Sequence, residues 1–564
     1  PGAPTGADDA ATKGLMDASN MYAEAAKPAK KSVLLRCGPS PLRKVCWYDP
    51  SPALSLESLF RAACGLSADQ QFLLTDAECC PVAVTSSLPS GQTFELVPLP
   101  MLSLPNALTP VAVVVVDPIS TGAVVAHHLH TRRGLHVVAV WSESVPDELK
   151  KFVAKGLDVE FAGRIQHEAG RVKVTADAVR RLPVHVVDVI VGCETGVLLG
   201  DELSEALGVR TNGTAQSPLR RNKFLQTEAV RNAALTACGQ MLATSSADVE
   251  TFLRERCTPF TKAVVKPVEG AGSDGVSICN TADEVRAAFA ALEGTKNVLG
   301  LTNYAVLLQE YLCGDEYVID TVSRNGVHKC VAIWKYDKRK FNNSPVVYFG
   351  MRLLPVDAEP RLQEMVTYTF AVLDALAIKN SCCHSEIKLE TRGPVLIEVN
   401  CRIHGGEGTW APMAEAAMGY SAVTALIDAH LDPGAFAALP TVPCNFAAHA
   451  MEAKLRSGVE GTLTAIDEDK MQTIRTLSSY RSEMLSFSVG KSIAKTIDAV
   501  TASGNINLVN ENLAQLQADY AALHALVEQG LFTAVPEEQH VQLELLRSHT
   551  GSRVASPPTP RHEP

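Results

Sequence analysis

Two runs of alternating apolar and polar residues between Ser385 and Arg402 dominate the pattern of this chain. The runs Ser385–Leu389 and Val395–Arg402 flank Thr391-Arg392-Gly393-Pro394, whose Gly-Pro step predicts the turn of an antiparallel hairpin. If the turn centres near Arg392, Glu386 lies about opposite Glu398. The period of two then predicts a polar face (Glu398, Asn400, Arg402) and an apolar face (Val395, Ile397, Val399, Cys401).

The predicted polar face carries two carboxylates, an amide oxygen and a guanidinium. Oxygen ligands of this kind suit Mg²⁺, which commonly binds substrate phosphates at the same time. The planar fork of Arg402 suits a phosphoryl oxygen. A solvated hairpin face with chance acids would explain the alternation, but it would not explain why Asn400 and Arg402 continue the same face.

Other periodic runs predict an α/β region and a smaller unit before it. Val111–Val116, Leu135–Trp141 and Val184–Val191 are apolar runs separated by helical stretches, which is typical of a buried parallel sheet. Between Ser32 and about Leu99, a strand–strand–helix–strand order resembles ubiquitin-like β-grasp domains. A docking module and an inert extension are both open for that unit.

Two lysines and a glycine-rich stretch are candidates for contact with phosphate groups. Lys223 starts a predicted helix that runs to about Cys238, and Lys266 ends a strand just before a loop with Gly270, Gly272 and Gly275. Such a loop lets backbone N–H groups approach phosphate oxygens. It is not G-x-x-x-x-G-K-[ST], so a P-loop is not predicted. Lys335–Lys340 is either a solvated charge run or a loop that closes over an anionic substrate.

Composition narrows the class of protein. A chain of 564 residues with 46% hydrophobic and 20% charged residues fits about three to four globular domains. The net charge of −11 argues against a general nucleic-acid surface, although not against a nucleotide. The sequence shows no long apolar run and no secretory signal, and its scattered cysteines fit reduced thiols, so we expect a cytoplasmic protein. Organellar targeting stays open, because the sequence does not begin with Met.

Taken together, these features resemble the ATP-grasp superfamily over roughly Val111–Val535. The similarity is greatest to L-amino-acid (dipeptide) ligases of the bacilysin-synthetase and carnosine-synthase types. It rests on the runs K-P-V-E-G-A-G-S-D-G-V, Q-E-Y-L-C-G-D-E-Y, H-S-E-I-K-L and I-E-V-N-C-R-I-H-G-G.

The resemblance implies an α/β and α+β multidomain fold. We expect a disordered tail at 1–30, a small β-grasp-like domain at 31–105 and a pre-grasp parallel α/β domain at 106–215. The ATP-grasp domain is expected at 216–440 with its lid at about 242–312, an α+β domain at 441–540 and a second disordered tail at 541–564.

The resemblance also implies roles for individual residues. Lys223 and Lys266 should contact the ATP phosphates, under a loop that contains Gly270, Gly272, Ser273 and Gly275. The adenine should meet Gln309, Glu310 and Leu312, and the ribose should meet Glu316. Mg²⁺, or Mn²⁺ as an alternative, should be held by Glu386, Glu398 and Asn400. Arg402 and Lys266 should act in catalysis, and the amino-acid site should include His404, Gly405, Gly406 and Glu407. The spacing from Glu386 to Glu398 is one residue tighter than in some relatives, which implies a shorter turn or a different metal geometry.

The implied function is an ATP-dependent carboxylate–amine ligase. Such an enzyme forms an amide bond through an acyl phosphate and releases ADP and phosphate. Two alternatives stay open, which are a biotin-carboxylase-like enzyme and a non-catalytic ATP-binding scaffold. The expected partners are small amino-acid or carboxylate substrates, with neither nucleic acid nor membrane. A homodimer and a protein partner of the N-terminal unit are left open.

Overall fold

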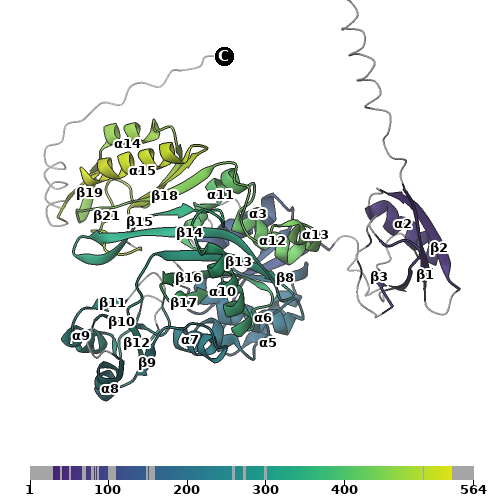
Figure 1. Ribbon diagram of the computed structural model, residues 1–564, viewed down its shortest axis with the longest axis horizontal. Coiled ribbons are helices and arrows are strands. Elements are labelled where there is room, and N and C mark those ends of the chain that lie inside the picture. The colour runs from purple at the N-terminus through teal and green to yellow at the C-terminus, as the bar shows by residue number, and fades with distance from the viewer. Residues whose placement is uncertain are drawn as a thin grey trace, which may run out of the picture. The chain divides into compact units, whose positions relative to one another are not determined.

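The computed structural model describes residues 29–536 except 38–40, 50–52, 67–71, 78–81, 83, 85–87, 99–108, 146, 148–149, 151–158, 257–260, 271–274, 298–300 and 500. The chain divides into two compact units, Pro1–Thr109 and Pro110–Pro564, and each is described by itself (Figure 1). Apart from the first two residues of strand β1, the predicted tails lie outside the described residues.

The first unit is a four-stranded sheet with one helix. The parallel pairing of β1 with β4 joins two antiparallel pairs in the order β2-β1-β4-β3. Leu56 and Phe60, one helical turn apart, are fully buried and pack with Trp47 and Leu35. Its elements are β1 (Ala29–Arg36), β2 (Arg43–Asp49), α2 (Ala53–Cys64), β3 (Phe72–Thr75) and β4 (Thr93–Pro98). Residues 83 and 85 of the run Val82–Thr85 lie outside the described residues.

The second unit begins with the parallel sheet that the apolar runs predict. Its strands are ordered β7-β6-β5-β8, and residues 112–116 of β5 are fully buried. The strands are β5 (Val111–Val116), β6 (His136–Trp141), β7 (Phe161–Gln166) and β8 (His185–Val191). The helices of this layer are α3 (Thr121–Thr131), α5 (Val172–Arg180), η1 (Glu194–Gly196) and α6 (Val197–Leu207). The turns after β5 and β8 touch, since a Cβ on Gly192 would lie 2.6 Å from the Asp117 carbonyl oxygen.

An eight-stranded sheet forms the centre of the second unit. Its order is β17-β16-β13-β14-β15-β18-β22-β20, so that the predicted hairpin occupies one edge (Figure 1). The strands are β13 (Glu316–Arg324), β14 (Val327–Phe341), β15 (Ser344–Leu353), β16 (Ser381–Glu390), β17 (Gly393–Asn400), β18 (His449–Leu455), β20 (Tyr480–Leu485) and β22 (Gly504–Asn510). Helix α10 (Leu362–Ala375) buries its apolar side in the core beneath β13, β16 and β17.

Two smaller sheets flank the central one. The first, ordered β11-β10-β12-β9, contains β9 (Gln240–Ala243), β10 (Ala263–Pro267), β11 (Ser277–Cys279) and β12 (Val306–Glu310), with α8 (Ser246–Arg256) and α9 (Ala282–Leu292). The second, ordered β21-β19-β23, contains β19 (Gly461–Ile466), β21 (Ser492–Ile493) and β23 (Phe532–Val535), with α14 (Glu468–Arg475) and α15 (Leu513–Glu528). The remaining helices are η2 (Ser217–Arg220), α7 (Lys223–Asn232), η3 (Gly406–Gly408), α11 (Ala411–Met418), α12 (Ala422–Leu431) and α13 (Pro433–Ala438).

One predicted helix was wrong in extent. The helix that starts at Lys223 ends at Asn232, because Ala234 takes a left-handed conformation with φ 58°. Residues 411–431 form two helices, separated where Gly419 ends α11 at φ 79° and Ser421 caps α12. Of the two alternatives left open for Lys335–Lys340, the loop is excluded, because the stretch lies inside strand β14.

Among the described residues, no helix is both long enough and apolar enough to span a bilayer.

Candidate functional site

The β16–β17 hairpin sets the two predicted carboxylates directly opposite each other. Glu386 pairs with Glu398, as the position of the turn predicts, and a bulge follows because Ile387 pairs with Leu396. The bulge reverses the alternation upstream of Glu398, so the prediction of one apolar face was wrong for Val395 and Ile397. These two side chains join Leu312 and Cys238, whereas Val399 and Cys401 lie in the large core under α10. The short spacing between Glu386 and Glu398 therefore still places the two carboxylates opposite each other.

Both hairpin acids remain charged although they are enclosed. Burial alone would raise the pKa of Glu398, but the charges of Lys223 and Lys266 hold it below its ordinary value. Burial would also raise the pKa of Glu386, and a hydrogen bond from His384 with the charge of Lys338 outweighs that effect. Asn400 donates through Nδ2 to Glu398 Oε1 at 3.2 Å, which leaves its own Oδ1 for another partner. Two carboxylates and an amide oxygen on one sheet face fit a divalent cation such as Mg²⁺.

The two predicted lysines approach the same acids from different elements. Lys223, at the start of α7, places Nζ 2.8 Å from Glu398 Oε2 and donates to the Gly270 carbonyl at 3.1 Å. Lys266, on β10, is 5% exposed, and its ammonium makes no hydrogen bond or ion pair within the described residues. Its burial lowers the pKa of its ammonium. A buried cation without a bonded anion fits a phosphate ligand.

The glycine-rich loop and the predicted adenine hinge border this group. Gly270 is described, whereas Gly272 and Ser273 lie outside the described residues. Gly275 has φ +67°, and a Cβ there would lie 2.8 Å from Leu292. The Glu310 amide donates to the Gly239 carbonyl at 2.9 Å, and Leu312 is buried next to Val395.

Two predicted nucleotide contacts are already engaged with protein groups. Gln309 donates through Nε2 to Gln240 Oε1 at 3.1 Å, within the smaller sheet. Glu316 forms an ion pair with Lys338 of β14 and lies 3.6 Å from Lys388 Nζ. Lys338, which lies in the stretch left open as a charge run or a loop, is thus a half-buried strand residue paired with Glu316.

Arg402 has a partner that sequence reasoning missed. Its Nε lies 3.2 Å from Glu194 Oε2, and Glu194 also meets Arg221 at 3.4 Å. Glu194 follows strand β8, so the carboxyl end of a parallel strand supplies it, and that position was the available signal. Burial would lower the pKa of Arg402, but the nearby carboxylates of Glu194, Glu398 and Glu386 raise it. The guanidinium stays charged beside the hairpin acids.

The segment after Arg402 is held against the turn after β5. Thr121 donates through Oγ1 to the Gly405 carbonyl at 3.1 Å, and the Glu407 amide donates to Ser120 Oγ at 3.1 Å. Ser120 and Glu407 both adopt left-handed φ values, 52° and 58°, which side chains other than glycine rarely take. Backbone strain of this kind is commonly found at functional sites. Gly406 and Glu407 are exposed.

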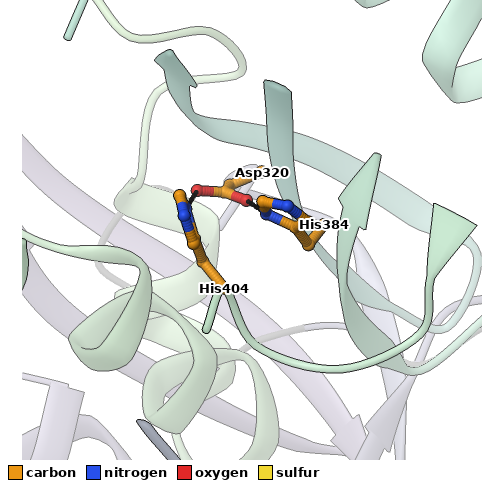
Figure 2. Close-up of side chains that lie close together, drawn as sticks. All are labelled: Asp320, His384 and His404. Atoms are coloured by element: carbon orange, nitrogen blue, oxygen red, sulfur yellow. Dashed lines mark hydrogen bonds and ion pairs between the residues drawn. The ribbon is translucent and has the colours of Figure 1, made fainter. Parts of the chain in front are cut away.

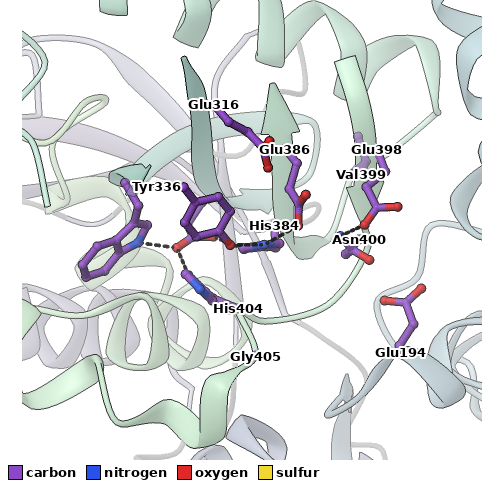
Figure 3. Close-up of polar contacts among 12 residues, drawn as sticks. Glu194, Glu316, Tyr336, His384, Glu386, Glu398, Val399, Asn400, His404 and Gly405 are labelled. Atoms are coloured by element: carbon purple, nitrogen blue, oxygen red, sulfur yellow. Dashed lines mark hydrogen bonds and ion pairs between the residues drawn. The ribbon is translucent and has the colours of Figure 1, made fainter. Parts of the chain in front are cut away.

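A buried network centred on Asp320 lies beside the acids and was not predicted. Asp320 accepts from His384 Nδ1 at 3.0 Å and from His404 Nδ1 at 2.9 Å (Figure 2). It also accepts from Trp334 Nε1 at 2.8 Å. His384 Nε2 in turn lies 3.4 Å from Glu386 Oε1. Figure 3 shows His384 between Glu386 and His404. Asp320 and His384 occur singly within apolar strands, so only their cross-strand pairing reveals the network.

Comparison with known proteins agrees with this geometry. Residues 259–410 match the ATP-grasp domain family. The chain is 28% identical to dapdiamide A synthase from Enterobacter agglomerans over 344 residues, which is 60% of this chain and 79% of that protein. It is 27% identical to the uncharacterized protein y4rH of Sinorhizobium fredii over 33% of this chain and 36% of that protein.

Solved structures show the same fold. An L-amino acid ligase from Bacillus licheniformis superposes with a TM-score of 0.59 at 17% identity, covering 76% of this chain and 99% of that one. N5-carboxyaminoimidazole synthase from Aspergillus clavatus, in complex with ADP and its ribonucleotide, has a TM-score of 0.54 at 13% identity, covering 75% and 99%.

Residues 259–410 thus match an ATP-grasp domain, and the chain has the mixed α/β multidomain fold that the sequence predicted. The similarity to dapdiamide A synthase and to the fold of the L-amino acid ligase supports an ATP-grasp ligase.

Proposed function

We propose that this ligase activates the carboxylate of an amino acid as an acyl phosphate and transfers the acyl group to the amine of a second amino acid. The observation that carries the proposal is the meeting of Lys223, Glu386, Glu398 and Asn400 on one face of the central sheet, with Arg402 following on the same strand end. It is the set of charges that phosphoryl transfer to a carboxylate requires.

The chemistry of the reaction explains why these residue types are needed. An amine cannot displace oxide from a carboxylate, so the oxygen must first become a phosphate leaving group. ATP supplies the phosphoryl group and Mg²⁺ neutralises charge on it. The protein mainly aligns the reactants and stabilises developing negative charge.

Each residue of the site has a role in that scheme. Glu386, Glu398 and the free Oδ1 of Asn400 hold the metal, while Lys223 and Lys266 bind phosphate oxygens. Leu312, Val395 and Ile397 offer an apolar wall for the adenine beside the Glu310 backbone. Arg402, kept charged by Glu194, faces the carboxylate that becomes phosphorylated.

The loop after Arg402 is the proposed amino-acid site. His404, Gly405, Gly406 and Glu407 lie where the hairpin meets the turn after β5, and Thr121 and Ser120 fix the backbone there. The hairpin of the central sheet and the turn after β5 of the parallel sheet therefore meet at this loop.

Phosphate release from ATP with Mg²⁺, measured across a pairwise amino-acid panel with products read by mass, tests the proposal. We expect phosphate only with particular pairs, together with a product mass equal to their sum minus one water. Phosphate release that requires bicarbonate and gives no amide product would favour a carboxylating enzyme. A panel that yields nucleotide binding but no phosphate would contradict ligase activity on amino acids.

A further inference from the structure

The Asp320 network contains two histidines that differ in what their outer nitrogens meet. Asp320 Oδ1 accepts from His384 Nδ1, and Oδ2 accepts from His404 Nδ1. His384 then turns Nε2 toward Glu386 at 3.4 Å and toward the Tyr336 hydroxyl at 3.5 Å. His404 Nε2 makes no hydrogen bond within the part of the chain that the structure describes, and it is not among the fully enclosed polar atoms there. Only His404 offers a ring nitrogen to a ligand.

The network is complete without a metal ion. A carboxylate has no proton to donate, so each histidine Nδ1 that bonds to Asp320 carries a hydrogen. With the Trp334 N–H, three donors satisfy this one carboxylate. Consequently the Nε2 atom of a neutral His404 is an acceptor of defined orientation.

The surroundings of His404 keep its ring fixed and uncharged. The Trp334 ring meets the His404 ring edge-on, with ring centroids 5.8 Å apart, and the Trp410 ring packs against it with centroids 5.1 Å apart. The imidazole therefore cannot turn freely. Burial, with the charges of His384 and Arg402, lowers the pKa of His404 in spite of the attraction of Asp320. Hydrogen bonds to Asp320 and Glu386 raise the pKa of His384. The titratable and charged groups around His404 are Asp320 on β13, Tyr336 on β14, His384 and Glu386 on β16, and Arg402 on its own segment.

His404 also lies at the right place along the chain. It is two residues from Arg402, and the guanidinium NH1 lies 4.0 Å from where a Cβ on Gly405 would be. Its ring centroid is 4.2 Å from that of His384, which contacts Glu386. His404 is therefore next to the histidine that contacts Glu386 and close in sequence to Arg402.

We propose that His404 is the general base that deprotonates the attacking amine, and that Asp320 is the residue that positions it. This inference rests on the proposed function. An amino acid enters with an ammonium group, which has no lone pair and cannot attack. A fixed imidazole acceptor beside the acyl group removes that obstacle.

The step balances in atoms and electrons. The ammonium gives one proton to His404 Nε2, and its lone pair forms the new bond to the acyl carbon. The bond from that carbon to the phosphate oxygen breaks, and phosphate leaves with the electron pair. The nitrogen loses its second proton to the departing phosphate, and the imidazolium returns its proton to water.

Hydroxylamine separates this step from carboxylate activation, because it is uncharged at neutral pH and attacks an acyl phosphate without a base. The test compares the full-length protein and H404Q with ATP, Mg²⁺ and a pool of the proteinogenic amino acids, with and without hydroxylamine. We expect H404Q to make hydroxamate at a rate within about threefold of the parent and amide about 100- to 10,000-fold more slowly. The amide deficit should shrink as the pH rises and the free amine becomes more abundant.

The control is T121V, which removes a hydrogen bond to the same loop without changing the base. It should alter hydroxamate and amide formation by the same factor. Equal losses of both products in H404Q would overturn the base role and leave the ligase standing, whereas unchanged amide formation would also overturn it. If the unaltered protein forms neither product, the proposed function fails, and the base role fails with it.

A measurement on the unaltered protein covers the case in which H404Q does not fold. The kcat for amide formation should fall with decreasing pH as His404 becomes protonated, with an inflection below about 6.5, the ordinary pKa of histidine. Hydroxamate formation, corrected for the neutral fraction of hydroxylamine, should lack that inflection. The same inflection in both reactions would contradict a base that acts only on the amine.

Discussion

At the scale of single residues, the side chain of Arg402 links two layers of the fold. Its guanidinium faces the hairpin acids while its Nε pairs with Glu194 of the parallel α/β layer. The Arg402 guanidinium is thereby oriented by Glu194, which lies more than 200 positions earlier in the sequence. A cation that is held before the substrate arrives costs no reorganisation during the reaction.

Replacing Arg402 with alanine should abolish most product formation while ATP still binds. Loss of one preorganised donor lowers kcat by about 100- to 1,000-fold. Product mass and a nucleotide-binding titration measure the two effects separately. R221A, which removes the other cation on Glu194, is the matched control and should cost much less. If R402A keeps its turnover, the assigned role of Arg402 is wrong.

Asp320 should make the protein sensitive to acid. Burial would raise the pKa of its carboxyl, but His404 and His384 hold it below the ordinary value. A depressed carboxyl pKa stabilises the fold above the unfolded pKa of about 3.9 and loses that effect as the pH falls through the folded pKa. We expect the melting temperature to fall steeply below about pH 4.

The variant D320N tests whether Asp320 is the source of this acid sensitivity. It should melt at least about 5 °C lower at pH 7, because a buried charged hydrogen-bond partner is lost, and its melting temperature should depend less on pH. Parallel pH profiles for the two proteins would show that the acid sensitivity arises elsewhere.

At the scale of elements, the C-terminal strands anchor the loop that follows Arg402. Glu452 of β18 is fully buried and accepts from Thr409 Oγ1 at 3.1 Å, while Asn507 of β22 donates to the Thr409 carbonyl at 2.6 Å. Asn505 donates to Glu452 at 2.5 Å. The end of the loop is thus attached to the central sheet, several strands away from the hairpin.

Removing this anchor should weaken amino-acid binding more than ATP binding. N507A deletes the hydrogen bond to the Thr409 carbonyl together with one to Ser482 Oγ, and only the first holds the loop. The net worth of one such bond, about 0.5–1.5 kcal/mol, corresponds to a two- to tenfold rise in KM for the amino acid. N510A is the matched control, because Asn510 lies on the same strand and donates to Ser479 instead. Steady-state kinetics with each substrate varied in turn would distinguish the outcomes, and an equal rise in KM for ATP would argue against a local anchor.

At the scale of the whole molecule, every residue of the proposed site belongs to the second unit. The first unit, up to Thr109, has its own core around Leu56 and Phe60. A separate core is the mark of a domain that folds by itself. Its contribution to this ligase is therefore open to a direct test.

Deleting residues 1–109 should leave the ligase intact. We expect kcat and KM within about twofold of the full chain, because no described residue of the site lies in the deleted part. Kinetics on the truncated and full-length proteins, with melting curves as the folding control, measure this. A large loss of kcat in a folded truncated protein would assign the first unit a part in catalysis.

The sequence alone determined the local features of this protein. Alternation and a Gly-Pro step were enough to predict the hairpin and the opposition of Glu386 and Glu398, because strand pairing around a short turn is a local property. The fully apolar run Val111–Val116 predicted a parallel strand, because such strands are buried on both faces. Motif resemblance then supplied the candidate lysines, acids and arginine.

Tertiary structure alone decided the rest. The bulge after Glu386 moved Val395 and Ile397 to another cluster, and packing placed Lys338 against Glu316 inside a strand. Glu194, Asp320 and His384 gained their roles from partners on other strands or in another layer. Contacts between residues distant in sequence depend on how sheets and helices pack, and periodicity within one segment carries no information about that packing.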